Sequence, residues 1–200
     1  MKKSIQKISY QGGYFHVYNR GNRKQNIFLE KEDYLKYLEK LREYKKKYNI
    51  SIICYCLMLN HIHLLVRQDS DIPVYKFMHA LHTSYSIHIN RKYNKIGHLF
   101  QGKYKQKEVD KDEYLLQLSS YIHLNPVVDG LVEKLENYQW SSYPDYIGIR
   151  QGTLCDKKSI LSDQLLEKYK KDTEERIALI RSDLDLTNLK VSQFEVGPRL

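Results

Sequence analysis

Two apolar runs lying close together decide the fold of this chain: ISIICYCL at residues 50–57 and HIHLLV at residues 61–66. Both are rich in Ile, Val and Leu, and both have the length of a β-strand. Only Met58, Leu59 and Asn60 separate them. Runs joined this tightly are predicted to pair as two antiparallel strands.

The second run carries two histidines, His61 and His63. Side chains alternate between the faces of a strand, so both imidazoles are predicted to point to the same side. Ile62, Leu64 and Val66 are then predicted to point into the core. Two imidazoles on one face can share a single metal cation.

Further along the chain, Tyr121 and Asn125 lie in a segment that is predicted to be a helix closed by Pro126. Positions i and i+4 share one face of a helix, so the hydroxyl of Tyr121 is expected near the amide oxygen of Asn125. A tyrosine hydroxyl is a weak nucleophile at neutral pH unless a positive charge lies nearby. A metal site beside this tyrosine therefore indicates phosphodiester chemistry on nucleic acid.

Other side chains compete for these roles. Tyr114 lies two turns before Tyr121 on the same helix face and is predicted to pack or to stack on a base. His123 lies on the opposite side of that helix and is predicted to be structural or solvent-facing rather than a ligand. His79 and His82 have the i,i+3 spacing of a second metal site, although ordinary polar or DNA-facing residues also occupy such positions.

The remaining periodicities predict an α+β fold. The order strand, helix, strand, strand, helix, strand is that of the ferredoxin-like βαββαβ motif, an antiparallel sheet with helices on one face. The helix that carries Tyr121 is expected outside this core. Beside the two central strands, the predicted elements are a strand at 13–20, a helix at 33–48, a helix that begins near Asp71 and Pro73, and a basic strand at 103–109.

A C-terminal extension is predicted after the last motif. The pattern weakens there, and residues 163–181 then read as a charged amphipathic helix. We therefore expect a domain at residues 1–148 and a helical extension at residues 149–200.

Composition limits the function further. The chain has 200 residues, with 33 Lys and Arg against 24 Asp and Glu, a formal charge of +9 that favours a polyanionic partner such as nucleic acid. No apolar run approaches the roughly 18 residues of a membrane span, and no secretory signal is apparent, so we expect a cytoplasmic protein without a membrane partner. The three cysteines, Cys54, Cys56 and Cys155, lack the spacing of a disulfide framework.

Tyrosines give a further indication of nucleic-acid binding. The chain has 18 of them, several among lysines and arginines. Their rings can stack on unpaired bases while neighbouring cations hold phosphates, although most tyrosines are structural. The candidate DNA-binding residues are Arg20, Arg91, Lys103, Tyr104 and Lys105.

Taken in order, the motifs resemble those of the single-tyrosine HUH transposases of bacterial insertion sequences, the IS200/IS605-like group, and especially the REP-associated branch. The resemblance extends from Tyr14 to Gly148. It rests on YFHVYNRG at 14–21, MLNHIHLLV at 58–66, GHLFQGKY at 97–104, YIHLNPV at 121–127 and WSSY at 140–143.

The resemblance implies a role for each site residue. His61 and His63 would bind a divalent cation, Tyr121 would be the nucleophile, and Asn125 would complete the ligand set. The implied product is a 5′-phosphotyrosine with a free 3′-hydroxyl, and attack by another 3′-hydroxyl would rejoin strands without ATP. The resemblance suggests Mg²⁺, whereas imidazole and amide ligands would also accept Mn²⁺ or Zn²⁺.

The expected substrate is therefore single-stranded DNA with a hairpin, which the protein would cleave and rejoin. The smaller insertion-sequence enzymes often have glutamine where this chain has Asn125, and they work as dimers, whereas the REP-associated branch is thought to act as monomers. Both a monomer and a homodimer remain open. The alternatives are a replication-initiator-like nickase and a hairpin-binding protein that does not cleave.

Overall fold

The structure, a computed structural model, describes residues 9–109 and 112–191. Its centre is one antiparallel sheet with the strand order β2-β3-β1-β4. This is the order of the predicted βαββαβ motif, in which β1 lies between β3 and β4. The strands are β1 (Tyr14–Arg20), β2 (Ile50–Leu57), β3 (His61–Gln68) and β4 (Lys105–Val109).

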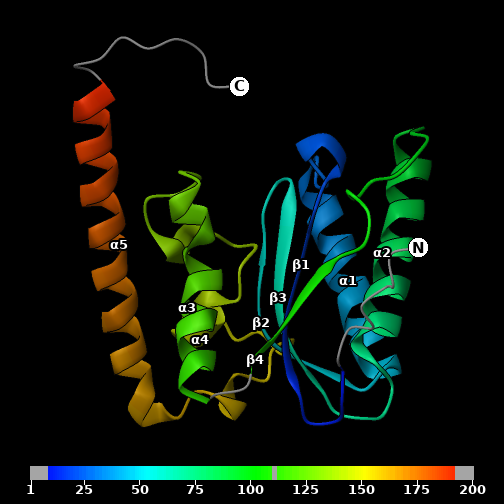
Figure 1. Cartoon of the computed structure of the whole chain (residues 1–200), viewed down its shortest axis with the longest axis horizontal. Helices are drawn as coiled ribbons and strands as arrows, with labels where there is room; N and C mark the ends of the chain where they lie inside the picture. The colour runs from blue at the N-terminus through cyan, green and yellow to red at the C-terminus, as the bar shows by residue number, and fades with distance from the viewer. Residues whose placement is uncertain (1–8, 110–111, 192–200) are drawn as a thin grey trace, which may run out of the picture.

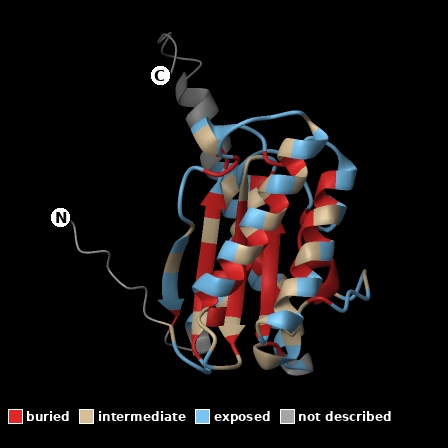
Figure 2. Ribbon diagram, turned by 90° about the vertical axis from the view of Figure 1, so that its right-hand side faces the viewer, coloured by how far each residue is buried: buried red, intermediate tan, exposed pale blue. Residues whose placement is uncertain are grey.

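Two helices, α1 (Lys31–Lys47) and α2 (Val74–Lys92), cover one face of the sheet (Figure 1). Their apolar stripes pack on the inward residues of the strands, among them Ile62, Leu64 and Val66, as the alternation predicts. Figure 2, viewed from this side, shows buried strands behind helices whose outer faces are exposed.

The other face of the sheet is covered by α3 (Asp112–Val128), and α5 (Asp163–Val191) packs outside α3 (Figure 1). A second apolar cluster joins this face to the helices, with Cys54 and Leu65 from the strands and Ile122 from α3. The short elements on this side and in the loops are α4 (Tyr143–Tyr146) and the 3₁₀ turns η1 (Asn22–Lys24), η2 (Leu135–Asn137) and η3 (Lys157–Ser159).

The described part of the C-terminal segment adds to both layers. Leu154 is buried in the cluster beneath α1 and α2, and the backbone N–H of Asp156 donates to the carbonyl of Ile52 over 2.7 Å. Tyr169 and Thr173 of α5 are buried against α3. The described part of this segment therefore packs against the sheet and its helices.

Two helix ends differ from the prediction. Asp71 was predicted to cap helix α2, with Pro73 in its first turn. The helix instead begins at Val74 with Pro73 at the cap position, and the N–H of Val74 donates to Oε1 of Gln68 over 3.2 Å. Helix α3 continues past Pro126 to Val128. No helix in the described part of the chain is long and apolar enough to cross a membrane.

Candidate active site

The two strand histidines lie on the sheet face that α3 covers. Ile62 and Leu64 point to the α1 and α2 side, so the strand alternation sends His61 and His63 to the other side. The centroids of their rings are 5.2 Å apart. His63 is buried and His61 is half-buried, and burial lowers the pKa of both, that of His63 to about 3. Both imidazoles are therefore neutral at physiological pH, the state that binds metal.

A third histidine, His16 of β1, lies beside this pair. Its Nε2 is 3.0 Å from Nδ1 of His63, and the two rings stack with centroids 5.2 Å apart. Tyr18 stacks on His63 as well, at 5.7 Å. Burial and the nearby charge of Lys107 lower the pKa of His16 to about 4. The ring of His63 is therefore held by two stacked rings, those of His16 and Tyr18, and by its hydrogen bond with His16.

The turn before β3 holds His61. Its Nδ1 is 2.7 Å from Oδ1 of Asn60, and the carbonyl of Asn60 accepts a hydrogen bond from the N–H of Gly21 over 2.7 Å. A Cβ atom on Gly21 would lie 2.0 Å from the carbonyl oxygen of Gln25, so only glycine fits there. The glycine that ends the YFHVYNRG motif thus lets the chain from residue 21 to residue 25 turn tightly, while the N–H of Gly21 donates to the carbonyl of Asn60.

Tyr121 faces these histidines from α3. Its side chain is 52% exposed, and its ring centroid is 6.3 Å from that of His63 and 6.5 Å from that of His16. The three side chains line a pocket of about 440 Å³. Its wall is completed by Tyr18, Lys107, Glu108, Val109, Tyr114, Gln117, Leu118 and Arg176. An exposed phenol therefore stands at the mouth of a pocket with buried imidazoles at its base.

Asn125 lies one turn after Tyr121, and its amide nitrogen is turned toward the helix. The Nδ2 atom donates to the carbonyl oxygens of Tyr121, over 3.0 Å, and Ile122, over 3.1 Å. The carbonyl of Ile122 would normally accept from the N–H of residue 126. Pro126 has no N–H, so the amide of Asn125 takes its place. Oδ1 is left for the site, and a hydrogen bond to Asn125 raises the pKa of His61, against the larger lowering by burial. Asn125 and His61, far apart in sequence, thus come together.

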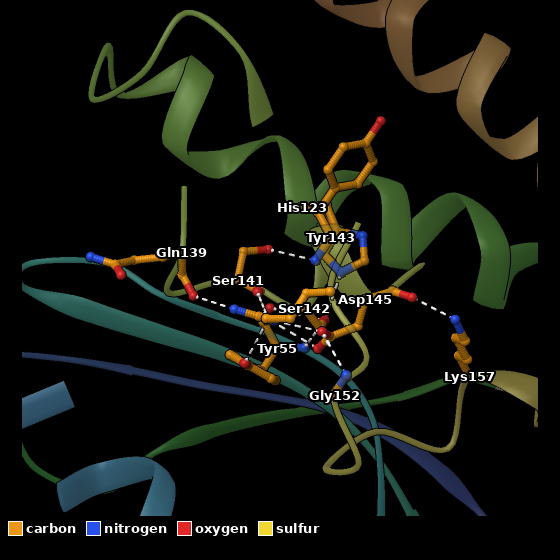
Figure 3. Close-up of polar contacts among 10 residues, drawn as sticks. Tyr55, His123, Gln139, Ser141, Ser142, Tyr143, Asp145, Gly152 and Lys157 are labelled. Carbon is orange, nitrogen blue, oxygen red and sulfur yellow. Dashed lines mark hydrogen bonds and ion pairs between the residues drawn. The ribbon is translucent and has the colours of Figure 1, made fainter. Parts of the chain in front are cut away.

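His123 fixes how α3 is rotated on the sheet. It is fully buried on the side of the helix away from Tyr121, with Nδ1 2.7 Å from the hydroxyl of Tyr169 and Nε2 2.7 Å from that of Ser142. Ser142 in turn accepts from the N–H of Tyr55 over 2.9 Å, which joins α3 to β2 (Figure 3). His123 was predicted to be structural or solvent-facing, and the structure shows the structural role. Its contacts help to orient Tyr121 toward the histidines.

Further hydrogen bonds hold the segment of the WSSY motif, residues 140–143, in place. The N–H of Ser142 donates to the carbonyl of Tyr55 over 3.0 Å, and Asp145 forms an ion pair with Arg150 at 2.5 Å (Figure 3). Arg150 also donates to the carbonyls of Gln139, over 2.7 Å, and Ser141, over 2.6 Å. These contacts hold the segment after α3 against β2.

Comparison with known proteins decides the family. The family described as "Transposase IS200 like" matches residues 9–125, more than half of the chain, and the match contains both histidines, Tyr121 and Asn125. The chain belongs to the IS200-like transposase family. The predicted family is thereby confirmed, and membership implies an enzyme that cleaves and transfers DNA. No curated protein sequence matches this transposase.

One solved structure supports the fold of the transposase. A REP-associated tyrosine transposase, solved with a bound REP hairpin, superposes with a TM-score of 0.63 at 14% identity, over 73% of this chain and 86% of that one. A candidate transposase from Deinococcus radiodurans R1 has a TM-score of 0.40 at 21% identity, over 61% of this chain and 95% of that one. The first likeness confirms the α+β fold.

The predicted DNA-binding residues of the transposase lie in different parts of the structure. Lys105 pairs in register with Tyr18, with its ammonium nitrogen 5.9 Å from the ring centroid, and Arg20 pairs with His61, so both lie at the sheet face of the site. Lys103 is exposed just before β4. Tyr104 packs against the cluster beneath α1 and α2, and Arg91 is exposed on α2. The structure therefore does not bring Tyr104 or Arg91 to Tyr121.

Sequence reasoning missed the four aromatic or basic residues His16, Tyr18, Lys107 and Arg176 of the pocket. The first two alternate with the core residues of β1, a pattern that could have placed them on the same face as the strand histidines. Lys107 follows the same alternation in β4. No sequence signal indicated Arg176, because its place depends on how α5 packs on α3. Neither His79, which is exposed on α2, nor His82, whose ring stacks on Phe100 at 4.1 Å, lies at this pocket.

Proposed function

We propose that this transposase cleaves and rejoins single-stranded DNA that contains a hairpin, with Tyr121 as the nucleophile. The observation that carries the proposal is the position of Tyr121, exposed at the mouth of a pocket, 6.3 Å between ring centroids from His63. An accessible hydroxyl beside neutral imidazoles in a strongly basic chain is suited to attack on a phosphodiester.

The residues present fit a divalent cation, which we propose to be Mg²⁺ or Mn²⁺. Among the described residues no three His, Cys, Asp or Glu side chains are placed to hold one, and we propose that an amide oxygen completes the set. Asn125 offers Oδ1 because its Nδ2 is bound to backbone carbonyls, and it contacts His61. We assign the ligand set to His61, His63 and Asn125. A bound cation would supply positive charge that stabilises the phosphorane-like transition state.

The chemistry follows from the groups in the pocket. The hydroxyl oxygen of Tyr121 attacks the phosphorus and loses its proton to solvent, a bond to phosphorus forms, and the bond from phosphorus to the 3′ oxygen breaks. The released 3′ oxygen takes up a proton, which leaves a 5′-phosphotyrosine and a free 3′-hydroxyl. A second 3′-hydroxyl reverses these steps and joins a new strand. One ester replaces another at each step, so no ATP is needed.

The charges around the pocket support a DNA strand as substrate. Lys107 and Arg176 line the pocket, and Lys105 and Arg20 lie on the same sheet face. Cations that share one face of the site can hold phosphates of the strand, and Tyr18 and Tyr114 offer rings for stacking. The hairpin is proposed because the structurally similar REP-associated transposase binds one.

A cleavage assay with the full chain tests the proposal. Labelled single strands with and without a hairpin, and a duplex control, are incubated with Mg²⁺, Mn²⁺ or EDTA and run on a denaturing gel. We expect a metal-dependent protein–DNA adduct and transfer to an added 3′-hydroxyl strand with the hairpin-containing single strand, and neither with the strand that lacks a hairpin nor with the duplex. Cleavage without transfer would indicate the nickase. Tight binding without any adduct, across many hairpins, would contradict the proposal and favour a hairpin-binding protein.

A further inference from the structure

The strongest unexplained contact at the site is between two buried histidines of neighbouring strands. His16 is 6% exposed and His63 is 9% exposed, and Nε2 of the first lies 3.0 Å from Nδ1 of the second. In the register of β1 and β3, Tyr18 is opposite His63 and Leu65 is opposite His16, so the contact runs diagonally across the pair. Both rings are therefore placed by the strand pairing itself.

The number of N–H groups on each ring decides which histidine donates the hydrogen bond. A neutral imidazole carries one N–H and one lone pair, so a hydrogen bond between two of them needs one donor and one acceptor. If the lone pair of His63 Nε2 is to face the site, its Nδ1 must carry the hydrogen and donate it. Nε2 of His16 is then the acceptor, and the hydrogen of His16 is on Nδ1.

The other strand histidine is arranged in the same way. Nδ1 of His61 is 2.7 Å from Oδ1 of Asn60, an oxygen that can only accept. When Nδ1 of His61 carries the hydrogen and donates it to Asn60, Nε2 keeps its lone pair. A cation shared with Oδ1 of Asn125 would then take the place of the hydrogen bond between His61 and Asn125. Both strand histidines thus have an acceptor at Nδ1 supplied by a neighbouring residue.

We propose that His16 is a positioning residue that holds His63 in the tautomer and ring orientation needed for metal binding, with Asn60 doing the same for His61. This rests on the proposed metal site and adds the residues behind its ligands. Such outer partners typically change metal affinity by about 10- to 100-fold when removed. The partner here is an uncharged imidazole rather than a carboxylate, so it adds no negative charge at the ligands.

The choice of variants isolates the acceptor. His16→Leu keeps the bulk of the side chain and removes the acceptor, whereas His16→Gln places an amide oxygen near the position of Nε2. His79→Gln, at an exposed position on α2, is the matched control. His61→Ala removes a proposed ligand and reports on the metal site itself.

Calorimetric titration of the full chain with Mn²⁺, without DNA, measures the effect directly. We expect His16→Leu to weaken Mn²⁺ binding by about 10- to 100-fold, with His16→Gln and His79→Gln close to wild type. In cleavage assays the Mn²⁺ concentration for half-maximal rate should rise in His16→Leu while the rate at saturating Mn²⁺ recovers. A purely structural role would not separate these two quantities.

Two results would overturn the proposal. If His61→Ala weakens Mn²⁺ binding but folded His16→Leu does not, the metal site stands and the role of His16 is wrong. If wild type binds no more Mn²⁺ than His61→Ala, the metal site fails as well. If His16→Leu does not fold, nitrogen-15 NMR of the wild type still shows which ring nitrogen of His63 carries the hydrogen. We expect the hydrogen of His63 on Nδ1, and a hydrogen on Nε2 would contradict the proposal.

Discussion

The side-chain amide of Asn125 donates to the carbonyl oxygen of Tyr121 over 3.0 Å, so the proposed ligand and the proposed nucleophile are fixed to each other within one helical turn. The same amide satisfies the carbonyl of Ile122, which Pro126 leaves without its backbone partner. The Asn125 side chain therefore replaces the missing backbone hydrogen bond, and its Oδ1 atom is left to face His61.

This arrangement predicts two losses for Asn125→Ala. Mn²⁺ affinity should fall by about tenfold or more because a ligand oxygen is removed, and the free energy of unfolding should fall by about 1 kcal/mol because carbonyls lose their donor. Calorimetric titration and urea unfolding measure the two effects. Asn137→Ala, at an exposed position of η2, is the control. Unchanged Mn²⁺ binding in Asn125→Ala would remove Asn125 from the ligand set.

His123 should matter for stability, and its protonation should make stability depend on pH. Burial lowers the pKa of His123 to about 3, whereas the unfolded chain has the ordinary value near 6.5. Between these values the unfolded state binds one more proton than the folded state, so the stabilisation is complete above pH 6.5 and is lost as pH falls. The slope is about 1.4 kcal/mol per pH unit for such a group.

Urea unfolding of wild type and His123→Gln from pH 7.5 to pH 4.5 checks this prediction. His123→Gln should be less stable by about 2 kcal/mol at pH 7, because Tyr169 and Ser142 lose well-placed partners. Below pH 6.5 its stability should fall with a slope smaller by about 1.4 kcal/mol per unit. Equal slopes in the two proteins would show that His123 does not take up this proton on unfolding.

Arg176 should bind the DNA backbone. It extends from α5 to the pocket of Tyr121, and none of the ion pairs among the described residues involves it. Arg176→Ala should weaken single-strand binding and reduce the dependence of log affinity on log salt by about 1, since one phosphate contact is lost. Lys171→Ala, an exposed cation on the same helix that pairs with Glu175 at 3.9 Å, should change neither quantity. Equal salt slopes for wild type and Arg176→Ala would contradict the contact.

The features predicted from sequence are those that depend on local periodicity. The faces of Ile62, Leu64 and Val66 and the strand order of the βαββαβ motif follow from alternation and connection rules, and the structure confirms them. The helix boundary at Pro126 was wrong because a side chain, that of Asn125, replaces the missing N–H. Asn125 directly precedes Pro126, but helical spacing alone does not show that its amide turns back to the carbonyl of Ile122.

Features that depend on packing between distant segments were not predictable. His16 supports His63 only because β1 pairs with β3, and Arg176 reaches the pocket only because Tyr169 and Thr173 seat α5 on α3. Tyr104 and Arg91 looked equivalent to Lys105 in sequence, yet the sheet separates them from the site. A residue can contribute to the site only if it lies on the same face of the sheet, and amino-acid composition does not show the face.

The most direct test of the central claim is to locate the covalent bond. Wild type, Tyr121→Phe and Tyr114→Phe are incubated with a hairpin-containing strand and Mn²⁺, then digested, and the peptide that carries the nucleotide is sequenced by mass spectrometry. Tyr114 is a matched control because it lies on the same helix, lines the same pocket and is 51% exposed. We predict a phosphodiester on Tyr121 in wild type and in Tyr114→Phe, and no adduct in Tyr121→Phe despite normal binding. An adduct that persists in Tyr121→Phe, or that maps to another residue, would contradict the assignment of Tyr121 as the nucleophile.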